Sequence, residues 1–380
     1  MLRRILWFTL LCASPVLLLT AQQPATKQAA TQQPPAKQPA PVDLMQGPEM
    51  PSFTVTLQQV LAPVLVYDRN HNYVNGLTPD QFRLYDNGKE QNLTSVDVTY
   101  TPISMVVAIQ ANAEADKILP KVNRIGAMLQ PIVLGDQGEA AVVAYDHRVR
   151  LLQPFTSDAD DITKAIKSIT AGSNSCRLID AVEQSVRLLS HRNKNRRRIL
   201  LVIGEGRDDG SLAHSRETLE ELQLANVAVY WVDMSHIIGR LTEAAPDPRP
   251  DNTPPASHPL PGGVPSTPTT VEQATGANGG SADIVPLLVE IFRDVKNIFK
   301  IPTATLYTKG TGGEQFSFAT QKGLESAISE IGDQLHSQYL ITYTPNNKGD
   351  GGFHHITVEV IGHDYRCETK PGYFMSSNFH

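Results

Sequence analysis

Residues 105–109 form a run of five consecutive apolar residues, MVVAI, that ends at the polar residue Gln110. A short apolar run of this kind is typical of a β-strand that is buried on both faces. A small polar turn follows at residues 110–114, and a helical pattern begins after it. Because open α/β sheets bind their ligands at the carboxyl ends of strands, we expect any functional site to begin at Gln110.

Strand-like and helix-like patterns alternate from residue 104 onward. Such alternation predicts an α/β fold, in which right-handed crossovers build a doubly wound, mainly parallel sheet with helices on both faces. Strands are expected at 104–110, 139–145, 148–153, 197–204, 227–233 and 302–308. Helices are expected at 116–130, 158–169, 177–190, 213–225, 284–299 and 321–337.

The two flanks of this region have strand and turn signals only. Residues 53–100 and 338–375 alternate apolar and polar positions between Gly, Pro, Asn and Asp turns. Neither segment is large enough to be stable alone. We therefore expect them to pair into one small, discontinuous β-domain, with the α/β domain, residues 103–337, inserted between them.

Two segments lack any hydrophobic pattern and are rich in proline. Residues 22–50 are interpreted as a disordered Pro/Gln-rich linker, and residues 242–280 as a mobile insertion in the α/β domain. The formal net charge of the 380 residues is −6. Nucleic-acid binders normally carry a basic face, so this charge argues against nucleic acid as a partner.

The N-terminus has the pattern of a secretory signal peptide, residues 1–21. Two arginines precede an apolar stretch at 5–19, and Thr20-Ala21 offers a cleavage point. Since the apolar stretch is short for a bilayer span, we expect export to the periplasm or the extracellular space with no membrane span after cleavage. A retained membrane anchor is the alternative.

Seven short motifs in the flanks and near the end of the α/β region form a recognisable pattern. They are YD at 67–68, VNGLTPDQF at 74–82, DNGK at 86–89, GGEQF at 312–316, QYLITYTP at 338–345, GFHHITV at 352–358 and KPGY at 370–373. With these motifs the chain resembles the secreted von Willebrand factor A-related family that is abundant in acidobacteria, over roughly residues 53–375. The resemblance implies a von Willebrand A-type α/β domain with an accompanying β-domain, a combination whose function is usually unassigned.

The resemblance also implies a place for a metal-ion-dependent adhesion site at the top of the sheet. Its pattern is Asp-x-Ser-x-Ser after the first strand, Thr on a second loop and Asp after the fourth strand, whose hard oxygens hold Mg²⁺. The matching positions here are Gln110, Asn112, Glu114, Cys176 and Glu205. None carries the expected residue, so the site is degenerate.

The residues at these positions are poor Mg²⁺ ligands. The two amides offer neutral oxygens, and the cysteine is a soft ligand. The charged residues nearby divide into arginines, which repel a cation, and carboxylates, which attract it. The arginines are Arg177 and Arg207, and the carboxylates are Glu114, Glu205, Asp208 and Asp209. We expect no cofactor; if any metal binds, Glu205 and Glu114 would hold it.

An enzyme would require a nucleophile with a base. Cys176 precedes a predicted helix, where a thiolate can be stabilised, but His236 is the one histidine expected near it. A buried or disulfide-paired Cys176 is the simpler interpretation. The sequence does not decide whether Cys176 and Cys367 form a disulfide.

Two further polar features favour structural roles. His354 and His355 are adjacent in a predicted strand and point to opposite faces, so they do not share a metal. The basic run at 192–198, RNKNRRR, is expected to be a solvated turn, with binding to an anionic surface as the alternative.

The first functional hypothesis is therefore an exported, non-catalytic interaction protein. It would present the sheet-top loops 110–116, 173–177 and 205–212 and the insertion 234–283 to an unknown protein or cell-envelope component, without a metal. The second hypothesis is a divalent-cation-dependent adhesion module that uses Glu205, Glu114 and the amide oxygens. The third is an enzyme that uses Cys176.

Overall fold

The computed structural model describes residues 42–43, 59–97, 101–235, 301–318, 320–347, 351–362 and 364–375. The predicted signal peptide, most of the linker, the 242–280 insertion and the predicted helix at 284–299 lie outside the described residues.

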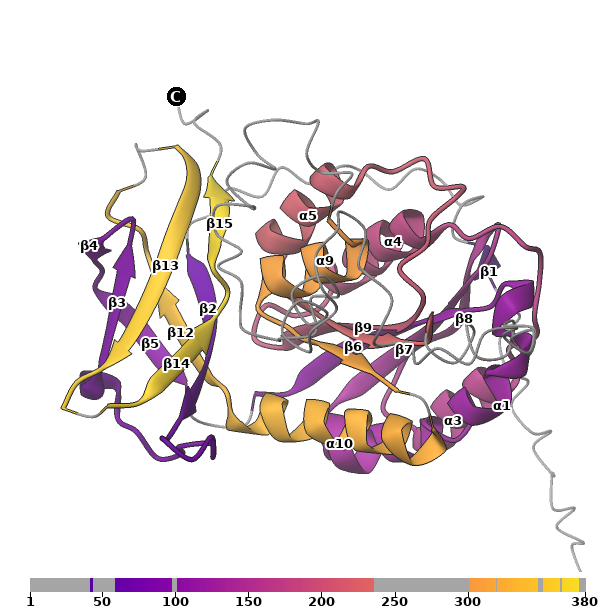
Figure 1. Cartoon of the computed structure of the whole chain (residues 1–380), viewed down its shortest axis with the longest axis horizontal. Coiled ribbons are helices and arrows are strands. Elements are labelled where there is room, and N and C mark those ends of the chain that lie inside the picture. Colours follow the sequence, from indigo (N-terminus) through magenta and orange to yellow (C-terminus); the bar gives the residue numbers. More distant parts are fainter. Residues whose placement is uncertain are drawn as a thin grey trace, which may run out of the picture. The chain divides into compact units, whose positions relative to one another are not determined.

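A seven-stranded sheet forms the centre of the α/β region (Figure 1). Its order is β1-β8-β7-β6-β9-β10-β11, and the strands from β7 to β11 run parallel. The strands β8 and β1 are antiparallel additions at one edge. The predicted mainly parallel sheet is confirmed. The strands are β1 (Val42–Asp43), β6 (Ile103–Gln110), β7 (Glu139–Tyr145), β8 (Val149–Thr156), β9 (Arg197–Gly204), β10 (Val227–Asp233) and β11 (Gln315–Ser317).

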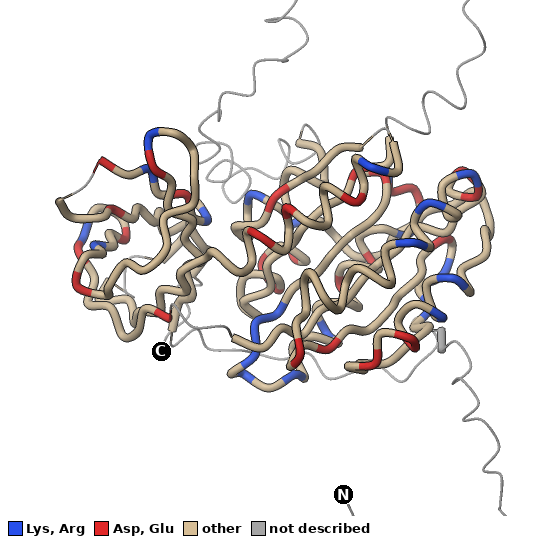
Figure 2. The backbone as a smooth tube through the Cα atoms, turned by 90° about the horizontal axis from the view of Figure 1, so that it is seen from below, with Lys and Arg blue, Asp and Glu red and all other residues tan. Residues whose placement is uncertain are grey.

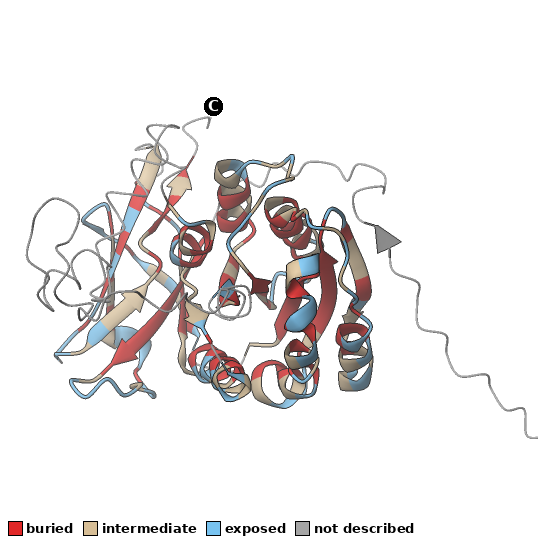
Figure 3. Ribbon diagram, turned by 45° about the vertical axis from the view of Figure 1, so that its right-hand side comes forward, coloured by how far each residue is buried: buried red, intermediate tan, exposed pale blue. Residues whose placement is uncertain are grey.

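Strand β6 is buried along its whole length, as its apolar run predicts (Figure 3). Its side chains alternate between two cores because successive residues of a strand face opposite sides. Met105 and Val107 pack in one core, and Val106 and Ala108 pack in the other. The organising role of this strand follows from its two fully covered faces.

Helices cover both faces of the sheet (Figure 1). One face carries α4 (Leu178–Ser190), α5 (Ser215–Leu224) and α9 (Thr303–Thr311). The other carries α3 (Ala159–Lys167), α10 (Gln321–Ser337) and the short helical turns between residues 113 and 134. These turns are η2 (Ala113–Lys117), α1 (Leu119–Val122), α2 (Gly126–Met128) and η3 (Leu129–Leu134). None of the helices described is long and apolar enough to span a bilayer.

Two predicted elements are wrong. Residues 302–308 were expected as a strand but begin α9, in which Thr308 and Thr311 donate side-chain hydrogen bonds to the carbonyls of Ala304 and Tyr307. These bonds and the burial of Tyr307 outweigh the β-propensity of the threonines. The predicted helix 116–130 is a series of short turns, in which Pro120 occupies the first turn of α1, a position where its missing N–H is tolerated and a new helix starts.

Two four-stranded sheets form a β-sandwich from residues at both ends of the described chain. The sheet orders are β14-β2-β12-β5 and β15-β13-β3-β4, so each sheet combines two early and two late strands, which alternate in the first sheet only. The early strands are β2 (Val60–Tyr67), β3 (Phe82–Asp86), β4 (Lys89–Glu90) and β5 (Leu93–Asp97). The late strands are β12 (Tyr339–Tyr343), β13 (Gly352–Val360), β14 (Arg366–Thr369) and β15 (Gly372–Met375).

A fully buried carboxylate joins these strands. Asp86 accepts hydrogen bonds from the hydroxyls of Tyr343 and Tyr373 at 2.9 and 2.7 Å, and from the amide of Asn347 at 3.0 Å. His354 Nδ1 lies 2.8 Å from the same carboxylate. The predicted opposite orientation of the two histidines is confirmed, since His354 is buried and His355 is exposed. His354 is thus a hydrogen-bonded core residue.

The prediction of a solvated turn for the basic run at 192–198 is confirmed for residues 193–195, which are exposed, but it is wrong for the four arginines. Arg192 and Arg196 clasp the carboxylate of Glu139, which also accepts a hydrogen bond from Ser104 at 2.6 Å. The last two arginines of the run donate to backbone carbonyls of neighbouring elements. Lys and Arg are also interspersed with Asp and Glu along the rest of the backbone (Figure 2). The run therefore ties the start of β9 to β7, α5 and α10.

Replacing Glu139 by Gln is expected to lower the free energy of unfolding by about 1 to 3 kcal/mol at pH 7, because partly buried charged hydrogen bonds are lost. Urea denaturation measures this loss. Burial raises the pKa of Glu139, but hydrogen bonds from Arg192 and Ser104 and the charge of Arg196 leave the pKa below its usual range. The stabilisation is thus present at neutral pH and disappears as pH falls through the folded-state pKa.

Glu183→Gln is the matched control. Glu183 pairs with Arg187 one turn away on α4, so its loss is expected to cost less than about 0.5 kcal/mol. Equal losses in the two variants, or a Glu139→Gln effect that stays constant down to pH 3, would contradict the proposed clasp.

Candidate functional site

Three loops meet at the carboxyl edge of the parallel sheet, and we call residues 110–116, 173–177 and 205–212 the apex. The backbone N–H of Ala113 donates to the carbonyl of Ser173 at 3.0 Å. The backbone N–H of Asp209 donates to the carbonyl of Cys176 at 3.0 Å. The loops converge because β6 and β9 are adjacent parallel strands that end at the same edge.

The two amide side chains of the apex are fully buried and hydrogen-bonded within the protein. Gln110 Nε2 donates to Asn112 Oδ1 at 3.0 Å, and Gln110 Oε1 accepts from the backbone N–H of Glu205 at 2.6 Å. Asn112 Oδ1 also accepts from the backbone N–H of Ala115 at 3.2 Å and caps η2. Both amide oxygens thus already have donors inside the protein.

An arginine lies between two carboxylates of the apex. Arg207 donates to Glu114 at 3.0 Å and to Asp209 at 3.0 Å through its two terminal nitrogens. Asp209 also accepts from the backbone N–H of Cys176 at 2.6 Å and the hydroxyl of Ser175 at 3.1 Å. The bond from Cys176, with those from Arg207 and Ser175, holds the pKa of Asp209 below its usual range. The triad formed by Arg207, Glu114 and Asp209 therefore contains its own cation.

The remaining acid of the degenerate pattern, Glu205, is partly buried. Burial raises its pKa, and the negative charge of Glu114 raises it further, while Arg207 acts in the opposite direction. Both effects make the ionised form of Glu205 less favourable than in water. A cation close to Glu205 would reduce the free-energy cost of ionising its carboxyl group. Among the described residues, Arg207 has this effect, since its charge lowers the pKa of Glu205.

Cys176 is buried and is a free thiol, as is Cys367. Burial and the negative charges of Asp208 and Asp209 raise the pKa of Cys176 to about 12. At neutral pH the side chain is thus the weakly nucleophilic thiol rather than the thiolate. His236 lies outside the described residues.

A buried aspartate that the sequence analysis missed holds the loop after β9. Asp180 is 1% exposed and accepts backbone hydrogen bonds from Leu212 and Ala213 at 3.0 and 2.9 Å. Asp180 also forms an ion pair with Arg177 at 2.6 Å, so Arg177 helps to keep this carboxylate in place under the loop. A carboxylate in the first turn of α4, beside apolar positions, was the signal that could have revealed it.

The backbone of Leu212 is held in this way while its side chain is 76% exposed. Among the described residues it is the more exposed of two large apolar side chains at the surface, the other being Ile361 at 46%. This exposed leucine, on the same loop as Arg207 and Asp209, gives the apex an apolar contact point.

The apex donors do not fit a hard divalent cation. The amide oxygens of Gln110 and Asn112 are used internally, the thiol of Cys176 is soft and protonated, and Arg207 pairs with Glu114. Within the described part of the chain, no group of three or more His, Cys, Asp or Glu is arranged to hold a metal ion.

Comparison with known proteins identifies the α/β region. Residues 112–207 match the model of the von Willebrand factor type A domain. No curated protein matches the chain.

Three solved structures are similar to the chain. An aerotolerance-related membrane protein of Bacteroides fragilis is 12% identical, with a TM-score of 0.36 over 61% of this chain and 99% of that one. BatB of Bacteroides thetaiotaomicron is 14% identical, with a TM-score of 0.34 over the same shares. The proximal thread matrix protein 1 of the mussel byssus is 11% identical, with a TM-score of 0.38 over 66% of this chain and 50% of that one.

Cys176 is expected to react slowly with a thiol-specific probe at pH 7.5, because its side chain is buried and its pKa is about 12. Cys367 serves as the internal reference, since it is only partly buried, although its own pKa is about 11. Mass spectrometry of peptides after timed labelling gives both rates. Labelling of Cys176 as fast as in urea-unfolded protein would restore the enzyme hypothesis.

Proposed function

Because the chain carries a von Willebrand factor type A domain, we propose that it is an exported, non-catalytic interaction protein whose apex binds a protein or cell-envelope component without a divalent cation. The observation that carries this proposal is the triad, in which the guanidinium of Arg207 lies between Glu114 and Asp209. A positive side chain thus neutralises acids of the apex without a metal ion.

Coulomb interactions support metal independence. A divalent cation near Glu114 would also lie near Arg207, and the repulsion at about 4 Å costs several kcal/mol at an effective dielectric constant of about 20. Binding would require Arg207 to leave both carboxylates and would break the hydrogen bonds of Asn112 and Gln110. These losses oppose any gain from coordination.

The form of the apex supports a contact role. The loops are joined by backbone hydrogen bonds, so little conformational entropy is lost when a partner binds. Leu212 offers apolar area, and the partly exposed triad of the same apex offers charged groups for an interface. The buried thiol of Cys176 offers no nucleophile, which supports a non-catalytic role.

A cation-dependent adhesion module is the second candidate, and one observation favours it. Glu205 and Glu114 repel each other, and this repulsion raises the pKa of Glu205. A divalent cation that displaced Arg207 would relieve the repulsion. The metal titration described next separates the two candidates.

Calorimetric titration of the exported protein with Mg²⁺, Ca²⁺ and Mn²⁺ is expected to show no micromolar affinity. Arg207→Gln removes the internal cation, so this variant should bind Mn²⁺ about tenfold more tightly than the wild type, a change of ~1.4 kcal/mol. Arg187→Gln, on the surface of α4, is the control and should behave as wild type. Micromolar Mg²⁺ affinity that Glu205→Ala abolishes would support the cation-dependent module instead.

Leu212→Asp is expected to weaken partner capture from the envelope fraction of the source organism by at least about tenfold, because a truncated interface anchor costs more than 1 kcal/mol. Ile361→Asp is the matched control, because it places the same charge at the other exposed apolar residue. Loss of the same captured proteins in both variants, or in neither, would contradict apex binding.

A further inference from the structure

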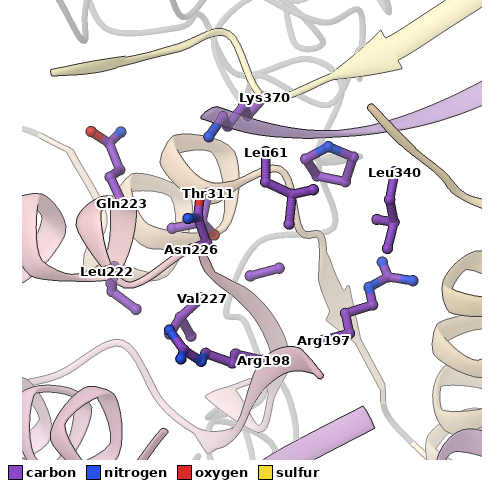
Figure 4. A pocket seen from close by; sticks show the side chains of 12 residues that line it. Leu61, Arg197, Arg198, Leu222, Gln223, Asn226, Val227, Thr311, Leu340 and Lys370 are labelled. Atoms are coloured by element: carbon purple, nitrogen blue, oxygen red, sulfur yellow. The ribbon is translucent and has the colours of Figure 1, made fainter. Parts of the chain in front are cut away.

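The pocket at the amino end of the parallel sheet is too small for an organic ligand. It lies between the first residues of β9 and β10 and the strands β2 and β12 (Figure 4). Its volume is about 20 Å³, counted as the space open to the centre of a water molecule, which is room for about one water. The two arginines in its lining, Arg197 and Arg198, donate to backbone carbonyls. A further partner is therefore expected at the surface rather than in this pocket.

The edge of the seven-stranded sheet at β8 accepts an added strand. β1 lies beside it (Figure 1) and pairs antiparallel at two positions, Val42 with Leu151 and Asp43 with Arg150. On its other side β8 pairs with β7. Two of the eight residues of β8 thus have a strand partner on the outer side, and the rest have none there within the described part of the chain. Unpaired backbone N–H and C=O groups along an edge are a template for further strands.

The two halves of this edge differ in how well they are protected. Beyond Leu151 the register between β8 and β7 shifts twice, and Pro154 has no backbone N–H. Bulges and proline are features that protect a sheet edge against pairing. Residues 149–151, which we call the open edge, have neither feature, and β1 pairs there. Because β1 pairs at two positions only, a partner strand that covers the whole open edge can replace it.

Arg150 gives the open edge a positive charge that is only partly compensated. Its guanidinium lies 3.5 Å from the carboxylate of Asp146, which also contacts His147 at 3.1 Å. Nε and Nη2 of Arg150 are buried and have no hydrogen-bond partner among the described residues. Buried donors normally have an acceptor, so these atoms favour an acid on an added strand. Arg148, two residues earlier, is exposed and adds a second positive charge.

The register of β1 indicates which side chains fit the open edge. Directly opposite residues of an antiparallel pair have their side chains on the same face of the sheet. The register therefore places an acid, Asp43, opposite Arg150. It places an apolar residue, Val42, opposite Leu151, which packs against the core on the α4 face. The open edge is thus complementary to an extended segment in which an acid follows an apolar residue.

We propose that the open edge is a strand-addition site for an extended acidic peptide of a partner protein, which takes the place of β1. The peptide runs antiparallel to β8, with its acid opposite Arg150 and the preceding apolar residue opposite Leu151. Backbone hydrogen bonds supply the affinity, and these two side chains supply the selectivity. Because β1 belongs to the same chain, it competes with the partner for this edge. The inference does not rest on the apex or on its proposed function.

Binding of fluorescent peptides to the exported protein tests the proposal. The probe has the sequence of residues 39–46, PAPVDLMQ, and the comparison peptide has Lys in place of Asp. Asp43→Lys places like charges opposite each other at Arg150 and so loosens β1. Fluorescence anisotropy should show that this variant binds the probe at least about tenfold more tightly than the wild type, because a tethered competitor is removed. The variant should also bind the probe at least about fivefold more tightly than the Lys peptide, since opposite charges attract at this position.

Asp136→Lys is the matched control. It makes the same change of charge at an exposed residue in the turn before β7, so it should bind both peptides as the wild type does. Equal affinity of Asp43→Lys for the two peptides, or no binding of the probe at about 1 mM, would overturn the proposal.

Arg150→Gln should remove the preference for the probe over the Lys peptide, and a preference that persists in this variant would contradict the role of Arg150. Since the variant also loses the ion pair with Asp146, hydrogen exchange of Asp43→Lys provides an independent measurement. The bound probe should slow exchange of β8 amides at least about fivefold and leave β11, at the opposite edge of the sheet, unchanged. Protection elsewhere without protection of β8 would overturn the site.

Discussion

The hydrogen bonds and ion pair around Asp209 are the interactions on which the apex depends. Its carboxylate accepts from the backbone N–H of Cys176, from Ser175 and from Arg207, and so joins two loops that are far apart in sequence. Charged hydrogen bonds of this kind are among the stronger ones in proteins. These hydrogen bonds hold the two loops in place and so shape the surface of the apex. They also occupy oxygens that a metal ion would need, and they therefore disfavour metal coordination.

Elsewhere in the molecule, too, single acids join separate segments by accepting several hydrogen bonds. Asp86 joins strands of the β-sandwich, Asp180 holds the loop that carries Leu212, and Glu139 clasps two arginines of the basic run. Each of these acids has several donors, as burial of a charge requires.

Much of the α/β fold could be predicted from hydrophobic pattern. The apolar runs of β6, β9 and β10 are so continuous that their side chains are removed from water only when both faces of each strand are buried. Where pattern and packing disagree, packing prevails: α9 is threonine-rich but helical, since its side-chain hydroxyls bond back to the helix. In the basic run at 192–198, residues 193–195 form the expected exposed turn, but the arginines were misjudged because acceptors of neighbouring elements lie within their reach.

The sequence by itself determined which residues stand at the apex and that Gln110, Asn112, Glu114, Cys176 and Glu205 depart from the metal-binding pattern. Local hydrophobic periodicity placed the ends of the strands, and the resemblance to the von Willebrand factor A-related family assigned these five residues to the metal-binding pattern. Only the tertiary structure decided that Arg207 pairs with Glu114 and Asp209, that Asp180 leaves Leu212 exposed, and that Lys370 is buried beside two arginines. These contacts join residues distant in the chain, and their geometry depends on packing that no local pattern records.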